Sequence, residues 1–207
     1  MLFKPILVAL SATISLVTAG SPVESGNWVE DHPGFSTQQC QGGRANGNTF
    51  TIPKSPDGSG GGGGCSNGHL RAERRYKNDY SSGVHQFGGV FKINYMSGNR
   101  ISIKQTFNGD SGPYFIMGVE QGGRLYSVEG GKTIADGVAT VGASVRINVV
   151  HNANNHRFSV YVNGKEMFRD DNAPGGSFYD KLGAYTTNSG SGDLSITWSD
   201  VQFWHRT

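Results

Sequence analysis

Residues 157–169 read R-F-S-V-Y-V-N-G-K-E-M-F-R. Two short stretches that contain β-branched and aromatic residues, F-S-V-Y-V and K-E-M-F, lie on either side of Asn163-Gly164, as in two paired strands. Asn-Gly suits a two-residue type I′ turn, because both central residues of that turn have positive φ. This stretch therefore predicts a β-hairpin.

Short stretches of the same kind continue along the chain, separated by glycine-rich or Asn-Gly turns, and no segment shows a sustained apolar period of 3.6 residues. The 207 residues include 32 glycines and suffice for one all-β domain. We predict an all-β fold, a two-sheet β-jelly roll or concanavalin-like sandwich. The expected strands are 70–76, 84–95, 100–107, 114–120, 124–128, 144–150, 157–162, 166–169, 178–185 and 194–205.

The first nineteen residues, MLFKPILVALSATISLVTA, have the pattern of a secretory signal peptide. Lys4 precedes an apolar run, and the segment ends in the small residues that a signal peptidase requires. A membrane anchor is the alternative, but hydroxyl residues interrupt the run, and spanning takes about 20 apolar residues. We therefore expect a secreted, extracellular protein that is not held in a membrane.

Residues 20–68 are expected to be a loop-rich N-terminal part of the same domain, and residues 69–207 its β-jelly-roll core. The five glycines at 60–64 predict a flexible excursion. It precedes Cys65, which with Cys40 would form a disulfide in an oxidising compartment. Neither cysteine lies in a C-x-x-C or near a paired histidine, so no metal site is expected, and nothing indicates a cofactor.

The formal net charge of +2 is too small to attract nucleic acid strongly over a distance. An anionic partner would have to be bound by a local group of residues. One stretch, G-D-S-G-P at 109–113, matches the pentapeptide around the serine of trypsin-like proteases. Too few residues precede Ser111 for the partner histidine and aspartate, so we interpret the stretch as a turn. The paired carboxylates E-x-D-x-x-E of glucan-hydrolysing sandwiches are missing as well, which disfavours glycoside hydrolysis.

Three predicted strands carry polar residues on one face each. In the first of these strands, alternation places Arg71, Glu73 and Arg75 on one face. In the second, at 100–107, it places Gln105 beside Ile103 and Phe107. The third carries Tyr179, Lys181, Gly183 and Tyr185, and its glycine leaves room for a chain to lie on the sheet. An ion-pair ladder and a core tyrosine are the structural alternatives to a binding site.

At these residues the chain resembles the alginate lyases of polysaccharide lyase family 7. R-A-E-R-R at 71–75 is similar to the family's R-x-E-L-R, I-S-I-K-Q-T-F at 101–107 to its V-x-x-G-Q-[IV]-H, and Y-D-K-L-G-A-Y at 179–185 to its Y-F-K-A-G-x-Y. The resemblance covers most of the chain from His69 on. It implies a jelly roll whose concave sheet binds an acidic polysaccharide and cleaves it by β-elimination. Phe107 stands where the family has its histidine.

On this resemblance Arg71 and Gln105 would stabilise the negative charge of the reacting uronate. Tyr185 would act as base and acid in turn, with its pKa lowered by nearby cations, and His85 is the reserve base. Arg75, Lys181, Glu73 and Tyr179 would bind the substrate.

Loss of the family histidine favours glucuronan or a mannuronate polymer, in which the C5 proton and O4 lie on one side of the ring. We expect a monomeric polysaccharide lyase. The alternative is a non-catalytic carbohydrate-binding or secreted host-interaction protein on the same fold.

Overall fold

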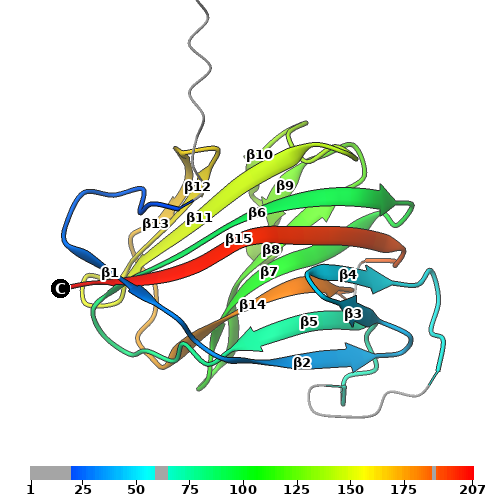
Figure 1. Cartoon of the computed structure of the whole chain (residues 1–207), viewed down its shortest axis with the longest axis horizontal. Helices are drawn as coiled ribbons and strands as arrows, with labels where there is room; N and C mark the ends of the chain where they lie inside the picture. Colours follow the sequence, from blue (N-terminus) through cyan, green and yellow to red (C-terminus); the bar gives the residue numbers. More distant parts are fainter. Residues whose placement is uncertain (1–19, 59–64, 188–189) are drawn as a thin grey trace, which may run out of the picture.

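The computed structural model describes residues 20–58, 65–187 and 190–207, so the predicted signal peptide and the glycine run at 60–64 lie outside the described residues. Two antiparallel sheets pack face to face, which confirms the all-β sandwich (Figure 1). The only helical turn in the described ranges is a 3-10 turn at Glu129–Gly131, η1. Within those ranges, too, no helix has the length and apolar character needed to cross a membrane.

The two sheets together contain every strand found among the described residues. The eight-stranded sheet has the order β13 (Lys165–Asp170), β12 (Arg157–Val162), β11 (Ser144–Asn152), β6 (Val84–Met96), β15 (Leu194–Arg206), β4 (Thr49–Ile52) and β3 (Arg44–Asn46), with β1 (Trp28–Asp31) also paired to β15. The seven-stranded sheet has the order β10 (Thr133–Ala135), β9 (Leu125–Ser127), β8 (Gly112–Glu120), β7 (Arg100–Asn108), β14 (Phe178–Tyr185), β5 (Arg71–Tyr76) and β2 (Phe35–Cys40).

The core lies between the sheets and is built from the inward-facing residues of the alternating strands. Phe87 and Phe91 of β6 pack against Trp198 of β15, with ring centroids 5.9 and 5.4 Å from the indole. Leu182 and Ala184 of β14 face the core from the other sheet, as their alternation predicts. Each large side chain buried in this way contributes about 2 kcal/mol to folding.

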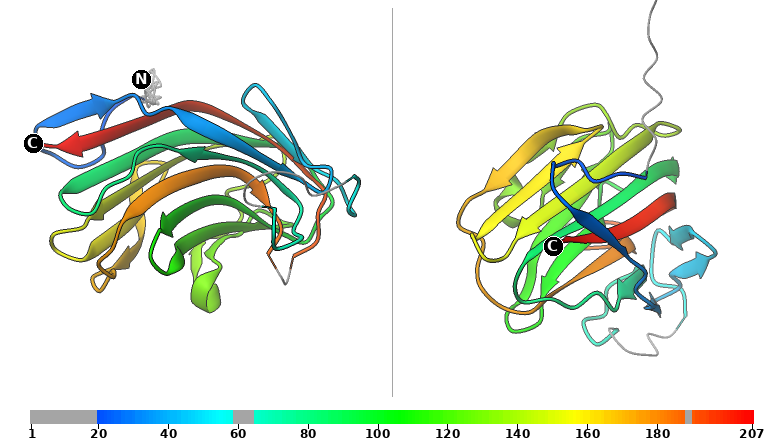
Figure 2. Two further views of the ribbon diagram at one scale, coloured as in Figure 1. Left: turned by 90° about the horizontal axis from the view of Figure 1, so that it is seen from below. Right: turned by 60° about the vertical axis from the view of Figure 1, so that its left-hand side comes forward.

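Both sheets arch in the same sense, and the outer face of the seven-stranded sheet lies on the hollow side of the arch (Figure 2). Strands β7, β14 and β5 run side by side through the middle of this sheet. The predicted polar residues of these three strands therefore meet on a concave surface.

Two turns confirm the turn predictions. Asn163 and Gly164 connect β12 to β13 with φ of 51° and 81°, the positive values of a type I′ hairpin. Ser111 lies in the turn between β7 and β8, where its amide donates to the carbonyl of Asn108 over 3.4 Å. The protease-like pentapeptide is therefore turn sequence.

Residues 20–68, which were expected to be loop-rich, contain several strands. Strands β1 to β4 lie between Trp28 and Ile52, and they belong to both sheets. Strand β2 is an edge strand with mostly exposed side chains, so it shows no apolar alternation. Cys40 at its end forms the expected disulfide with Cys65.

Candidate active site

Cross-strand pairing gathers the predicted site residues on one face of the seven-stranded sheet. Lys181 of β14 lies opposite Arg75 of β5 and opposite Gln105 of β7, and Tyr185 lies opposite Arg71. Directly opposed residues point to the same side of a sheet, so these five side chains share the concave face.

One residue on β7 departs from the predicted alternation. Ile103 was expected beside Gln105, but it faces the core and is fully buried. The register with β8 shifts between Ser102 and Lys104, and a bulge of this kind turns the following residues to the opposite face. Gln105 thereby stays on the concave face while Lys104 points inward.

Glu73 is the centre of the constellation and is fully buried. Its Oε1 accepts a hydrogen bond from Nε2 of Gln105 over 2.5 Å, and its Oε2 lies 3.3 Å from a guanidinium nitrogen of Arg71. Burial raises the pKa of Glu73, and the charges of Arg71 and Lys181 oppose that rise. The carboxyl group therefore ties Arg71 and Gln105 to one position.

Arg71 is held from two further directions. Its Nη1 donates to Oε1 of Gln38 on the edge strand β2 over 3.2 Å, and its Cζ lies 4.4 Å from the ring centroid of Tyr185. A guanidinium fixed by a carboxylate, an amide and an aromatic face keeps a defined orientation. Such a group presents its remaining donors to an anion without first having to be ordered.

Tyr185 is only partly buried, so the phenol is not sealed inside the protein. Its Oη accepts a hydrogen bond from Nδ2 of Asn67 over 3.2 Å. Burial raises the pKa of Tyr185, and the opposing effect of Arg71 is smaller. The expected lowering by nearby cations is therefore wrong, because desolvation outweighs them. The phenol is protonated at neutral pH and can donate a proton more readily than accept one.

Glycine is needed at position 183 for a reason that differs from the predicted one. Its φ is +140°, and a Cβ at this position would lie 2.2 Å from the carbonyl oxygen of Ala72 on β5. The register between β14 and β7 shifts between Leu182 and Tyr185. Glycine is thus required by the close approach of two backbones, and the shift sets the position of Tyr185.

Beside these groups lies a row of two aromatic rings flanked by cations. Phe107 and Tyr179 stack with centroids 5.1 Å apart. Lys181 Nζ lies 4.8 Å from the ring centroid of Phe107, and Cζ of Arg75 lies 4.0 Å from that of Tyr179. Arg75 also pairs with Asp79. This aromatic row, Phe107 and Tyr179, offers apolar faces next to positive charge, which suits a sugar ring that carries a carboxylate.

His85 does not join the constellation. It lies on β6 in the other sheet, where its ring stacks on Tyr80 with centroids 4.0 Å apart and its Nε2 lies 2.8 Å from the carbonyl of Ser82. It lines a separate pocket of about 390 Å³, and burial lowers its pKa. His151 and His205 line the same pocket, but no metal-holding cluster of three or more such groups occurs in the described ranges.

Three residues near the site were not singled out in the sequence. Gln38 lies opposite Glu73 on β2, and Asn67 contacts the Tyr185 hydroxyl. His69 packs on the Tyr185 ring with centroids 5.3 Å apart. A signal for His69 was available, because 69, 71, 73 and 75 share one face under a period of two.

No protein-family model matches the chain, and no curated protein matches it in sequence. Solved structures do match. An alginate lyase from Pseudomonas aeruginosa is 18% identical, with a TM-score of 0.61 over 79% of this chain and 86% of that one. The marine family 7 alginate lyase AlyA1 from Zobellia galactanivorans is 14% identical, with a TM-score of 0.60 over 87% and 96%. Alginate lyase AlyC3 in complex with dimannuronate is 12% identical, with a TM-score of 0.52 over 67% and 72%.

These likenesses show the fold. The chain has the β-jelly roll of the family 7 alginate lyases, as its three motifs predicted. Because the sequence identities are low, the activity has to be argued from the site itself.

Proposed function

We propose that the protein is a polysaccharide lyase that cleaves a 4-linked uronic-acid polymer by β-elimination. The observation that carries this proposal is the meeting of Arg71, Gln105 and Tyr185 on the concave face, although they come from three strands far apart in the sequence. The alginate lyases that share the fold act on acidic polysaccharides of this class, which supports the assignment.

The substrate carboxylate would be held by the cations and the amide of the site. Loss of the C5 proton moves negative charge onto that carboxylate, and donors that are already oriented stabilise such charge most effectively. Arg71 and Gln105 are oriented by Glu73, and Lys181 lies opposite Gln105 on the same face, where its charge acts on Glu73. Tyr185, which is protonated, would deliver a proton to the departing O4.

Glucuronan or a mannuronate polymer fits this arrangement better than polyguluronate. In the first two polymers the C5 proton and O4 lie on one side of the ring, so groups on one face of the sheet can serve both. Phe107 removes the imidazole that the related lyases have in this place and puts an apolar ring against Tyr179 instead. The dimannuronate bound by one of the similar structures is a ligand of the expected class.

A non-catalytic carbohydrate-binding protein is the second candidate, and Phe107 is the observation that favours it. The aromatic row and its two cations would bind an acidic sugar with no chemical step. The two candidates differ in product, since only the lyase generates an unsaturated sugar.

Incubation with glucuronan, polymannuronate, polyguluronate and pectate tests the proposal, with the ultraviolet absorbance of the new double bond as the readout. We expect product from glucuronan or polymannuronate, and no product from the Tyr185→Phe variant, whose fold should be unchanged. Tyr95→Phe is the matched control, because that tyrosine is 51% exposed on β6 in the other sheet. Retention on a uronan column without any double bond would favour the binding protein, and full activity of Tyr185→Phe would exclude its role.

We also propose that the protein is secreted and acts outside the cell as a monomer. The signal-peptide pattern of residues 1–19 and the Cys40–Cys65 disulfide support export to an oxidising compartment. We expect neither nucleic acid nor a membrane among its partners, because the formal charge is only +2.

A further inference from the structure

The proposed site lacks an evident proton acceptor, and the inference that follows rests on the proposed function. Phe107 has no titratable group, the fully buried Glu73 is engaged by Gln105 and Arg71, and burial favours the neutral form of the Tyr185 phenol. A β-elimination needs a group that takes the C5 proton. The acceptor must therefore be another side chain close to Tyr185.

All six histidines of the chain lie in the described ranges, and their positions leave one candidate. His32, His85, His151 and His205 line the separate pocket that contains Tyr80. His156 follows β11 in a turn, where its Nδ1 lies 2.8 Å from the carbonyl of Ala173. His69 alone packs against a residue of the candidate site.

His69 and Arg71 both pack against the same phenol ring. The His69 ring centroid is 5.3 Å from that of Tyr185 at an interplanar angle of 57°, while Arg71 Cζ is 4.4 Å from it. His69 is partly exposed, and across residues 20–58, 65–187 and 190–207 no group forms a hydrogen bond to its ring nitrogens. These nitrogens are therefore accessible to a substrate that lies on the concave face.

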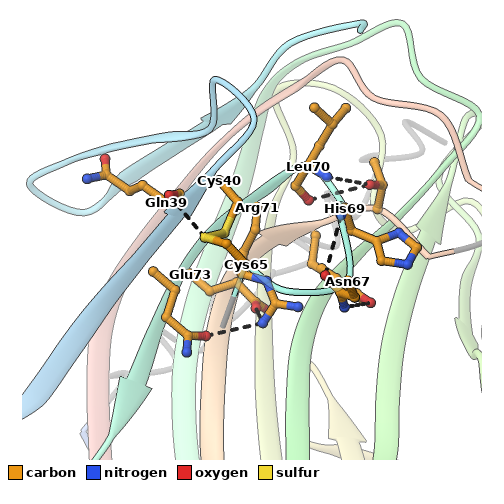
Figure 3. Close-up of a disulfide and its surroundings, with 11 residues drawn as sticks. Gln39, Cys40, Cys65, Asn67, His69, Leu70, Arg71 and Glu73 are labelled. Carbon is orange, nitrogen blue, oxygen red and sulfur yellow. Dashed lines mark hydrogen bonds and ion pairs between the residues drawn. A yellow bond between two sulfur atoms is a disulfide. The ribbon is translucent and has the colours of Figure 1, made fainter. Parts of the chain in front are cut away.

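The segment before β5 holds His69 in place from both ends. Cys65 is anchored to β2 by the disulfide, and Figure 3 shows Asn67 and His69 beside this bridge. The amide of His69 donates to Oδ1 of Asn67 over 3.3 Å. The amide of Leu70 donates to Oγ1 of Thr186 over 3.1 Å, directly after Tyr185. One short segment thus delivers both the imidazole and the amide that contacts the Tyr185 hydroxyl.

We propose that His69 is the catalytic base of this site and Tyr185 its acid. An unprotonated ring nitrogen of His69 takes the C5 proton, and the electron pair of the C5–H bond becomes the C4–C5 double bond. The C4–O4 bond breaks, and O4 takes its proton from the Tyr185 hydroxyl. Transfer of the proton from the imidazolium to the phenolate, directly or through water, restores both groups. The histidine thereby replaces the one that Phe107 displaces, from a different position in the chain.

The His69→Ala variant tests the assignment on the polymer that the wild-type protein cleaves fastest. We expect kcat to fall by about 10²-fold or more with a small change in KM, the loss typical of a missing general base. Added imidazole should restore part of the rate, which a merely structural role would not allow. His32→Ala is the matched control, since His32 is exposed and lies in the other pocket.

The outcomes separate this assignment from the proposed function. A wild-type protein that cleaves no uronan overturns both. A wild-type protein that cleaves one, together with a His69→Ala variant of full activity, overturns the role of His69 alone. If His69→Ala melts at a lower temperature, His69→Gln decides, because it keeps a polar side chain of similar reach that cannot act as a base. Full activity of His69→Gln would reject the assignment, and loss of activity would support it.

Discussion

Lys104 and Asp180 form an ion pair inside the core, with Nζ of the lysine 2.5 Å from Oδ1 of the aspartate. The Lys104 side chain is fully buried and that of Asp180 is 7% exposed. Nζ also lies 2.5 Å from Oγ1 of Thr106, and Oδ2 of Asp180 accepts a hydrogen bond from Asn78 over 2.8 Å. Burial lowers the pKa of Lys104, and Asp180 opposes that change.

Removing one partner of this pair should destabilise the fold strongly. Asp180→Ala leaves the ammonium of Lys104 buried without its counter-charge, and we expect a loss of about 3–5 kcal/mol in the free energy of unfolding. Denaturant unfolding measures it. The double variant Lys104→Met, Asp180→Leu should recover much of the loss, because two apolar side chains need no counter-charge. A loss below about 1 kcal/mol in Asp180→Ala would contradict the prediction.

His151 should make the fold sensitive to acid. Burial lowers its pKa from 6.5 to about 4, so the imidazole stays neutral in the folded protein at pH values where the unfolded chain already binds a proton. Its contribution to stability is complete above pH 6.5 and is lost as the pH falls toward 4, by up to about 3 kcal/mol. Across this range the free energy of unfolding of the wild type should fall relative to that of His151→Phe, because the variant has no imidazole to protonate. Parallel curves would exclude His151 as the cause.

Gly183→Ala should damage both the fold and the site. The added Cβ would meet the Ala72 carbonyl at 2.2 Å, and the φ of +140° disfavours any side chain. We expect a lower melting temperature and a loss of uronan binding, because Lys181 and Tyr185 flank the glycine. Gly175→Ala is the control, since a Cβ there has open space. Equal melting temperatures for the two variants would refute the argument.

The disulfide should matter to catalysis as well as to stability. Replacing Cys40 and Cys65 with serine should lower the free energy of unfolding by about 3 kcal/mol, the value expected for a loop of this length. It should also lower kcat more than it raises KM, because the bridge anchors the segment that carries Asn67 and His69. A reductant should have the same effect on the wild type and none on the double variant. Unchanged kcat after reduction would separate the bridge from the site.

The aromatic row should contribute to substrate binding more than to the chemical step. Phe107→Leu keeps an apolar side chain but removes the ring that stacks on Tyr179. We expect KM to rise about tenfold, or about 1.4 kcal/mol, with kcat nearly unchanged. Phe35→Leu serves as the control, because Phe35 is an exposed ring outside the row. A fall in kcat alone would place Phe107 in the chemistry instead.

Strand β14 shows what could be predicted from the sequence. Its bounds, Phe178–Tyr185, match the predicted strand. The prediction was possible because the apolar Leu182 and Ala184 occupy every second position and so indicate the face that packs on the core. Strand β2 could not be found in this way. It lies at an edge with mostly exposed side chains, and only its pairing with β5 makes it a strand.

Within the site, the face shared by the residues of one strand was predictable, and electrostatics was not. A period of two puts Arg71 and Glu73 on one face of β5, but only the observed pairing of β5 with β14 places Arg71 opposite Tyr185. The direction of the Tyr185 pKa shift depends on two opposing effects, burial of the ring, which raises the pKa, and the nearby charge of Arg71, which lowers it. Neither the degree of burial nor the distance to Arg71 can be read from residue order. The turn of Ile103 into the core depends on a local bulge in the same way.

The central place of β15 has a consequence for how the molecule is made. This strand is formed by some of the last residues, Leu194–Arg206, yet it pairs with β6, β4 and β1 in the middle of the eight-stranded sheet (Figure 1). Before those residues emerge from the ribosome, β1, β3 and β4 have no neighbour that links them to β6. Closure of the sandwich is therefore a late, long-range event, and a nascent chain that lacks β15 exposes unpaired strand edges to aggregation.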